Sequence, residues 1–211
     1  LFIFLFGSKF INNINLHGED EATTYLNTIS LYSYLSELDF LNVLKTTLQF
    51  HHPPARYYIS LPFFLIFEND FWVLRLANSI MWALTCCVIY KISKIILKEY
   101  AFITALLIGC SGLFSVHTLT FGLSGITLFL SLCVYELIKD QFNIDKIESL
   151  HKSFLRCNIY LFIAFLFYNT AVLYIFSLYA IFLYYLYKSK IKNKIKNKLT
   201  ITALTFAIFY I

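Results

Sequence analysis

The sequence is poor in charge, glycine and proline. Charged residues make up 14% of its 211 residues, against about 25% in soluble domains. Only 6 Gly and 3 Pro are present, which excludes collagen-like, low-complexity and disordered chains. The 5 Cys are odd in number and lie in apolar runs, which excludes a disulfide scaffold. Hydrophobic residues reach 59%, too many for a soluble globular domain, and indicate a membrane protein.

The apolar runs predict an all-α, polytopic transmembrane helical bundle, because a spanning helix needs about 20 apolar residues. The chain opens within such a run and its one Met is at position 81, so we interpret it as a fragment that starts near the end of a span. A signal peptide is the alternative, but no small-residue cleavage site follows. We expect one transmembrane domain over residues 1–211, with the end of span 1 at 1–11 and later spans at 71–97, 101–117, 119–138, 157–168, 171–187 and, as a start only, 199–211.

A long mixed segment, residues 12–70, separates the first two spans and contains all three prolines. Within it, residues 20–38 carry apolar side chains at helical spacing, which predicts a helix lying along the membrane surface. Residues 40–50 predict a second short helix, and His51-His52-Pro53-Pro54 should end it, because proline removes a backbone donor. The expected apolar stripe of the first helix comprises Ala22, Tyr25, Leu26, Ile29, Tyr32 and Leu35.

The basic residues predict the orientation of the spans. Alternating spans with residues 7–70 outside place 13 of the 17 Lys and Arg residues on the inner side, as the positive-inside rule requires. Most of these 13 basic residues lie in the lysine run Lys188–Lys198, in a charged loop at 139–156 and in the tight turn Lys98-Glu99-Tyr100. The run is most simply a topology anchor that also contacts anionic lipid headgroups. It has no interleaved aromatic residues, so we expect no nucleic-acid partner.

The outer segment holds the side chains that could carry chemistry. Glu19, Asp20 and Glu21 sit where a helix begins, and acids there can simply complement the helix dipole. They could instead supply a general base at the membrane surface. A His-Pro-Pro turn is also common between helices. The histidines His51, His52 and His117 lack the spacing of a zinc site, so we expect no metal and no cofactor.

Taken together, three short motifs resemble the N-terminal part of GT-C glycosyltransferases of the family 39 type. This group includes protein O-mannosyltransferases and the transferases that place aminoarabinose on lipid A. The order is an acidic pair with a following Tyr, then a His-Pro-Pro, then an Arg-Leu at the start of the second span. The residues concerned are Asp20-Glu21-Ala22 with Tyr25, His52-Pro53-Pro54-Ala55-Arg56-Tyr57-Tyr58 and Arg75-Leu76-Ala77-Asn78-Ser79.

The resemblance implies an inverting transfer of a sugar from a polyprenyl-phosphate carrier to a lipid, glycan or protein acceptor on the outer face. Asp20 matches the catalytic base and Glu21 the supporting acid; with the match shifted by one residue, Glu19 or Glu21 would replace Asp20. Tyr25, His52, Arg56 and Arg75 are the expected substrate-binding residues. Arg56 could otherwise be an interfacial anchor, and Arg75 could pair with Asp70 or extend to the membrane surface.

The sequence also departs from the family pattern. The segment Thr120–Gly125 has no acid, and Asn169-Thr170 stands where many relatives have a Thr-Lys or Ser-Lys pair. An inactive or non-enzymatic relative is therefore one alternative interpretation. A transporter or flippase of lipid-linked sugars is another. No predicted span after the outer segment contains the proline breaks that are common in transporters. Abundant Phe, Ile, Lys, Asn and Tyr suggest an AT-rich genome, and we expect a bacterial inner membrane.

Overall fold

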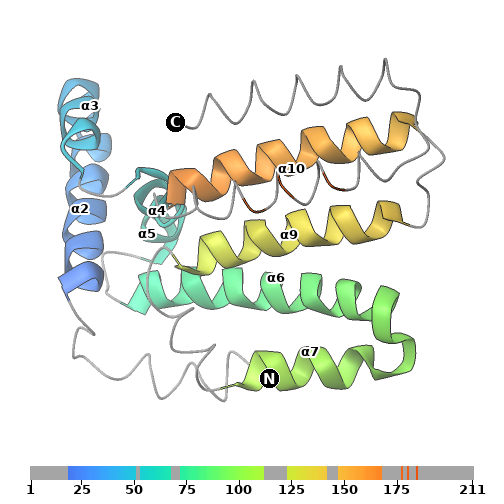
Figure 1. Cartoon of the computed structure of the whole chain (residues 1–211). Helices are drawn as coiled ribbons and strands as arrows, with labels where there is room; N and C mark the ends of the chain where they lie inside the picture. Colours follow the sequence, from blue (N-terminus) through green and yellow to red (C-terminus); the bar gives the residue numbers. More distant parts are fainter. Residues whose placement is uncertain are drawn as a thin grey trace.

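The computed structural model describes residues 19–50, 53–67, 72–111, 123–141 and 147–167, with Ser177, Ala180 and Tyr184. Over these residues every regular element is a helix, and none is a strand, which confirms the all-α prediction. Spans 6 and 7 and the lysine run lie outside the described part, apart from the three single residues. The helices form two groups, a bundle and a set that crosses one end of it (Figure 1). They are α2 (Glu19–Ser36), α3 (Phe40–Leu48), α4 (Ala55–Tyr58), α5 (Leu61–Phe67), α6 (Trp72–Leu97), α7 (Ala101–Cys110), α9 (Leu123–Gln141) and α10 (Ile147–Phe167).

Helices α6 and α7 form a hairpin around the turn predicted from sequence. A single 3₁₀ turn, Lys98–Tyr100, joins them, and Lys98 takes a positive φ of 48°. Helix α6 has 26 residues, about 39 Å at 1.5 Å per residue, which exceeds the roughly 30 Å of a hydrocarbon core. Within the described residues, the helical stretch Trp72–Cys110 is the one long and apolar enough to cross a membrane.

Helices α9 and α10 form a second, antiparallel hairpin that packs against α6. Ser124 near the start of α9 donates to Asn78 in the first half of α6, and Figure 1 shows α6 and α9 running in the same direction. Gly125 in α9 lies against the ring of Phe167 at the end of α10, and Cys133 lies against Cys157 halfway along. These contacts fix the register of the three bundle helices.

The charged segment 139–156 is not the loop that the sequence predicted. Helix α9 continues to Gln141 and α10 begins at Ile147, so the predicted fifth span, 157–168, coincides with the second half of α10. The reason lies in the contacts across the hairpin. Ser153 and Arg156 of α10 both donate to the buried carboxylate of Glu136 in α9, at 3.3 and 3.2 Å. The polar residues thus support a helix instead of interrupting one.

Helices α2 and α3 begin and end close to the positions that the sequence predicted for them. Helix α2 matches the expected 20–38 helix and α3 the expected second one. Between them Leu38 adopts a left-handed φ of 58°. Asp39 then caps α3 by accepting the backbone N–H of Asn42 at 3.1 Å. The Pro-Pro turn separates α3 from α4, as expected for residues that cannot continue a helix.

The buried face of α2 differs from the predicted apolar stripe. Thr24, Thr28 and Leu31 are fully buried, whereas Leu26 is 62% exposed. Tyr25, Ile29 and Tyr32 pack against Phe64, Val73 and Leu74 of α5 and α6. The buried face of α2 is thus rotated about the helix axis relative to the predicted apolar stripe. The cause is polar, because the threonine hydroxyls of α2 contact polar side chains of the segment that contains α4.

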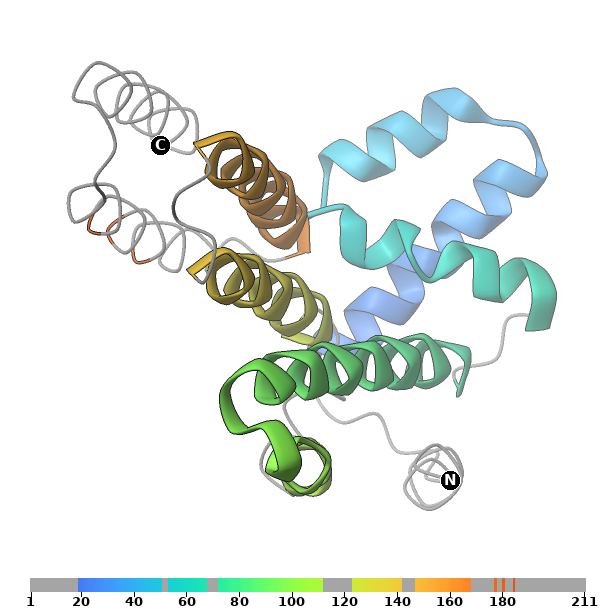
Figure 2. The ribbon, with the colours of Figure 1, turned by 90° about the vertical axis from the view of Figure 1, so that its right-hand side faces the viewer.

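Helix α4 connects α2 to the bundle. On one side, Tyr57 joins Leu31 and Leu61 in a buried cluster. On the other, Ala55 and Ile59 pack against the cluster of Met81, Ile126, Ala164 and Phe167 at the end of the bundle. Figure 2 shows α2 and the α4–α5 segment crossing beside this end. Helix α2 is therefore connected to the end of the bundle through α4 and α5, in addition to its packing on Val73 and Leu74 of α6.

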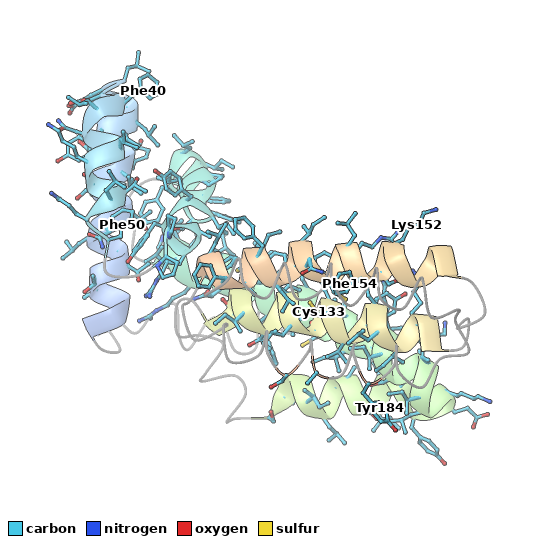
Figure 3. All side chains as sticks on the ribbon, turned by 45° about the horizontal axis from the view of Figure 1, so that its top comes forward. Phe40, Phe50, Cys133, Lys152, Phe154 and Tyr184 are labelled. Carbon is cyan, nitrogen blue, oxygen red and sulfur yellow. The ribbon has the colours of Figure 1, made fainter. Side chains whose placement is uncertain are left out.

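The described basic side chains divide between the two ends of the molecule. Lys152 lies at one end of the molecule, and Phe40, the first residue of α3, lies at the opposite end (Figure 3). This basic end also has the C-terminal half of α6, the turn after it, the end of α9 and the start of α10. Its lysines and arginine are Lys91, Lys94, Lys98, Lys139, Lys152 and Arg156, and the opposite end carries Lys45, Arg56 and Arg75.

Candidate functional site

The first turn of α2 contains two of the predicted site residues. Asp20 and Glu21 follow Glu19, where the helix begins. Their side chains lie outside the described part of the chain, as does all of His52. Thr24 is four residues beyond Asp20 and three beyond Glu21, and helix positions at these spacings are neighbours on the surface. The contacts of Thr24 therefore show what lies one helical turn from the backbone positions of the predicted acids.

Thr24 contacts Arg56, the predicted cation of the His-Pro-Pro segment. The Nη2 atom of Arg56 donates to Thr24 Oγ1 over 2.5 Å, and both side chains are 0% exposed. Helix α4 thus places its guanidinium against α2, one helical turn from the acids. Two motifs that are more than thirty residues apart in sequence are next to each other in the structure.

A second polar contact joins the same two segments one turn further along. Thr28 Oγ1 lies 3.4 Å from Ser60 Oγ, and both side chains are buried. Each hydroxyl also donates to a carbonyl of its own helical segment, Thr28 to Thr24 and Ser60 to Tyr57, at 2.8 Å. We call these two contacts, Thr24–Arg56 and Thr28–Ser60, the polar seam. Their equal spacing of four residues shows that the two segments run in the same direction where they touch.

Aromatic rings surround the polar seam. The ring of Tyr57 lies with its centroid 4.1 Å from that of Phe50 and 5.6 Å from Cζ of Arg56. The ring of Tyr25, a predicted substrate-binding residue, lies 6.1 Å from that of Phe64. Tyr25 is only partly buried, so it both packs on α5 and keeps exposed surface. Its role toward substrate stays a prediction.

Arg75, the other predicted cation, is buried in α6 with 3% of its surface exposed. It lies three residues before Asn78, so the two share a helix face, and Asn78 accepts the Ser124 hydroxyl at 2.6 Å. Arg75 therefore lies in the bundle close to α9, not at a free surface. Its alternative partner Asp70 is outside the described residues.

The sequence reasoning missed the hydroxyl residues of the seam. Thr24, Thr28 and Ser60 carry no motif, and their burial is a property of the packed structure. Asn78, a member of the third motif, forms an interhelical hydrogen bond with Ser124. In the part of the chain that the structure describes, no group of three His, Cys, Asp or Glu side chains could hold a metal ion.

A family model described as dolichyl-phosphate-mannose-protein mannosyltransferase matches residues 51–211. The chain belongs to this mannosyltransferase family. The residues that match the family model include the His-Pro-Pro segment, Arg56 and Arg75, and they begin after the acids of α2. No curated protein and no solved structure matches the chain.

Membership in the mannosyltransferase family confirms the resemblance seen in the sequence. It identifies the protein as a membrane glycosyltransferase of a family that uses lipid-linked sugar donors. The roles of Asp20, Glu21, Tyr25, His52, Arg56 and Arg75 stay predictions, because the match concerns the family and not its individual residues.

Proposed function

We propose that the protein transfers a sugar from a polyprenyl-phosphate carrier to a lipid, glycan or protein acceptor at the outer face of a bacterial inner membrane. The family match supports the donor class. The observation that carries the residue assignment is the Thr24–Arg56 contact, because it joins the two motifs of the outer segment at one place. Transfer at that place needs a base, a bound phosphate and an acceptor hydroxyl.

Asp20 is the proposed base. Its carboxylate takes the proton of the acceptor hydroxyl while that oxygen attacks the anomeric carbon of the sugar. The bond from this carbon to the phosphate oxygen breaks, and the polyprenyl phosphate leaves with the electron pair. A single displacement inverts the anomeric centre and requires one base only.

The leaving phosphate gains negative charge and needs nearby cations or hydrogen-bond donors. We assign this role to His52 and Arg75, with Tyr25 as a further donor-binding residue. Arg75 lies in the bundle, where a buried charge is expensive unless it is paired or used. Arg56, the third predicted cation, is a further candidate for this role, and its guanidinium is held against Thr24 of α2.

The proposed topology places α2 to α5 outside and the basic end inside. Six of the described Lys and Arg residues gather at the end remote from α2, which agrees with the positive-inside rule. The turn after α6 and the connection between α9 and α10 then face the cytoplasm. Within the long apolar stretch Trp72–Cys110, α6 crosses the membrane and α7 turns back into it.

The test compares the wild-type protein with Asp20→Asn, both expressed from the complete gene. Membranes are supplied with radiolabelled polyprenyl-phosphate sugars, and loss of label from the lipid is followed. Asp20→Asn should lower turnover at least about 10²-fold, the usual contribution of a positioned base. Asp39→Asn is the matched control, because this carboxylate caps α3 in the same outer segment.

Each other outcome changes the conclusion. Equal turnover in wild type and Asp20→Asn removes Asp20 from the mechanism and directs attention to Glu19 or Glu21. Absence of turnover with every donor, in folded protein, favours an inactive relative, in agreement with the missing acid before Gly125 and the missing lysine near Asn169. Movement of labelled lipid between leaflets without transfer indicates a flippase.

A further inference from the structure

We propose that α3 is anchored in the membrane surface, with one flank of leucines in contact with the acyl chains of phospholipids. We call this surface the leucine flank. It comprises Leu41, Leu44 and Leu48, and Leu38 in the turn before the helix extends it. The proposal concerns the lipid beside α3, whichever compartment that end of the bundle faces. It is also independent of the assignment of Asp20, since it uses no catalytic residue.

The leucine flank is exposed. Leu41, Leu44 and Leu48 are 63%, 58% and 79% exposed. Leu38 is 71% exposed and has the left-handed φ of 58°, a conformation usually taken by Gly or Asn. Neighbouring exposed apolar side chains of this kind mark a surface that contacts a membrane or another protein.

A different edge of α3 holds the helix to the protein. Val43 packs against the buried cluster that Tyr57 of α4 forms with Leu31 of α2. One turn later, Thr47 Oγ1 lies 2.6 Å from the hydroxyl oxygen of Tyr58 in α4. At about 100° per residue, positions 43 and 47 are about 40° apart around the helix axis. They define an inner edge of α3 that faces α4.

The two flanks of α3 beside the inner edge differ in chemistry. The leucine flank covers about 60° of the helix circumference and is centred about 110° from the inner edge. The other flank covers a similar arc, at a similar angle on the opposite side, and is polar. Its residues are Asn42, Thr46 and the C-cap residue Gln49. Helix α3 is thus amphipathic from flank to flank, which is the pattern of a helix that lies in the plane of a membrane surface.

The depth of α3 follows from the packing of α2, to which a short turn joins it. Side chains of α2 pack against Val73 and Leu74 in the first turn of α6. The long apolar stretch Trp72–Cys110 begins at this turn. Figure 1 shows α2 and α3 at this end of the bundle and crosswise to its helices. A helix at this level and in this direction has hydrocarbon on one side and water on the other.

The direction of α3 shows which flank faces the hydrocarbon. In Figure 2, which is seen from the basic end, α3 runs from right to left with α4 below it. Residues of a right-handed helix turn clockwise when the helix is viewed from its N-terminus. From an inner edge directed at α4, a clockwise turn of about 110° brings the leucine flank to the side on which the bundle lies. No described bundle helix lies in front of α3 in this view, so lipid has access to the flank.

Lys45 supports phospholipid as the molecule in contact with α3. Its side chain is exposed on the edge of α3 opposite the inner edge, about 40° around the helix from Leu41. A lysine beside the apolar side of a surface helix extends its ammonium group to lipid phosphates, while its methylene chain lies along apolar surface. The leucine flank and its basic border therefore match an anionic phospholipid surface.

The first experiment identifies the contact by photo-crosslinking. A benzophenone amino acid is placed at Leu44 or Leu48 in the protein expressed from its complete gene. The purified protein is reconstituted into vesicles of radiolabelled phosphatidylethanolamine and phosphatidylglycerol and irradiated, and we expect labelled lipid on the protein band. Thr46 and Gln49 are matched control positions, because they lie on the opposite flank of the same turns, and should acquire several-fold less label.

Four results of the crosslinking would overturn the proposal. Equal labelling of both flanks would mean that α3 has no lipid-facing side. A product of twice the mass would identify a second copy of the protein, and an unlabelled internal crosslink would identify another segment of the chain. Loss of the label when unlabelled polyprenyl phosphate is added would make the flank a site for the carrier and not for bulk phospholipid.

The second experiment measures depth. The fluorescence of Leu44→Trp and Thr46→Trp, after subtraction of that of the unsubstituted protein, is compared in vesicles whose lipids are brominated near the headgroup or near the end of the acyl chain. At the depth of about 5–10 Å typical of a surface helix, bromines near the headgroup should quench Leu44→Trp more strongly, and neither lipid should quench Thr46→Trp. Stronger quenching of Leu44→Trp by the deep bromines would place α3 inside the bilayer, and no quenching would place it away from lipid. Either result would contradict the proposal.

Discussion

Ser124 on α9 donates its hydroxyl hydrogen to the amide oxygen of Asn78 on α6 over 2.6 Å, with both side chains buried. The same hydroxyl lies 3.7 Å from the sulfur of Met81. This contact links two helices that are far apart in the chain. In a membrane, where apolar packing alone gives little preference between helices, such a bond helps to set their register.

The Asn78–Ser124 bond should show a small but measurable coupling energy. We expect Asn78→Ala and Ser124→Ala to destabilise the protein, with a coupling of about 0.6 kcal/mol, as is typical of interhelical bonds in membranes. A double-mutant cycle of unfolding in mixed detergent measures it. Strictly additive effects would mean that the two side chains do not stabilise one another. Ser131→Ala is the control, because Ser131 donates within its own helix.

Gly125→Ala should disrupt the contact between α9 and α10. A Cβ atom at this position would collide with the ring of Phe167, which is buried in the cluster at the end of the bundle. Overpacking of this kind costs about 1–3 kcal/mol. Tm measures the loss, and the companion change Phe167→Leu should restore much of it. Full stability of Gly125→Ala alone would contradict the close packing.

The two partners of the Glu136–Arg156 ion pair should differ in their cost of removal. The N–O distance is 3.2 Å, and the side chain of Glu136 is 7% exposed while that of Arg156 is 49% exposed. Glu136→Gln leaves an arginine that water can reach, so we expect a loss of at most about 1 kcal/mol. Arg156→Ala leaves a buried carboxylate with a weaker set of partners and should cost more. Unfolding free energies compare the two, and the reverse order would disprove the asymmetry.

The proposed topology predicts which side of the membrane each end faces. A cysteine placed at Lys45 in α3 should react with a membrane-impermeant maleimide added to spheroplasts. A cysteine at Lys152 in α10 should react only after the membrane is opened. The native cysteines provide the background, which is measured in the unchanged protein. In sealed spheroplasts, labelling of position 152 alone would show the opposite orientation. Labelling of both positions would contradict the proposal that the two ends face different sides of the membrane.

Local signals in the sequence predicted much of the fold. The Pro-Pro pair placed the break between α3 and α4, because proline cannot continue a helix. The Lys98-Glu99-Tyr100 triplet placed the turn between two apolar runs, and the turn is observed there. Periodic apolar residues predicted α2 to within a few positions. Each of these depends on residues close together in the chain.

The rotation of α2 and the extent of α10 could not be predicted in this way. Thr24 and Thr28 are buried because Arg56 and Ser60, about thirty residues later, approach that face of the helix. Leu26 is exposed although it belongs to the apolar stripe, since the stripe alone does not reveal which neighbour supplies polar partners. Likewise, the charged first half of α10 is helical because Glu136 on another helix accepts hydrogen bonds from it.

The charged first half of α10 has a practical consequence for imaging. Residues 147–156 span about 15 Å of helix at 1.5 Å per residue, and they run beside the charged end of α9. On the proposed topology this two-helix stalk emerges from the bilayer into the cytoplasm as an extension of the bundle. A marker domain joined to the ends of α9 and α10 would therefore lie beside two helices that are packed on each other. Particles could then be aligned by a feature outside the detergent belt.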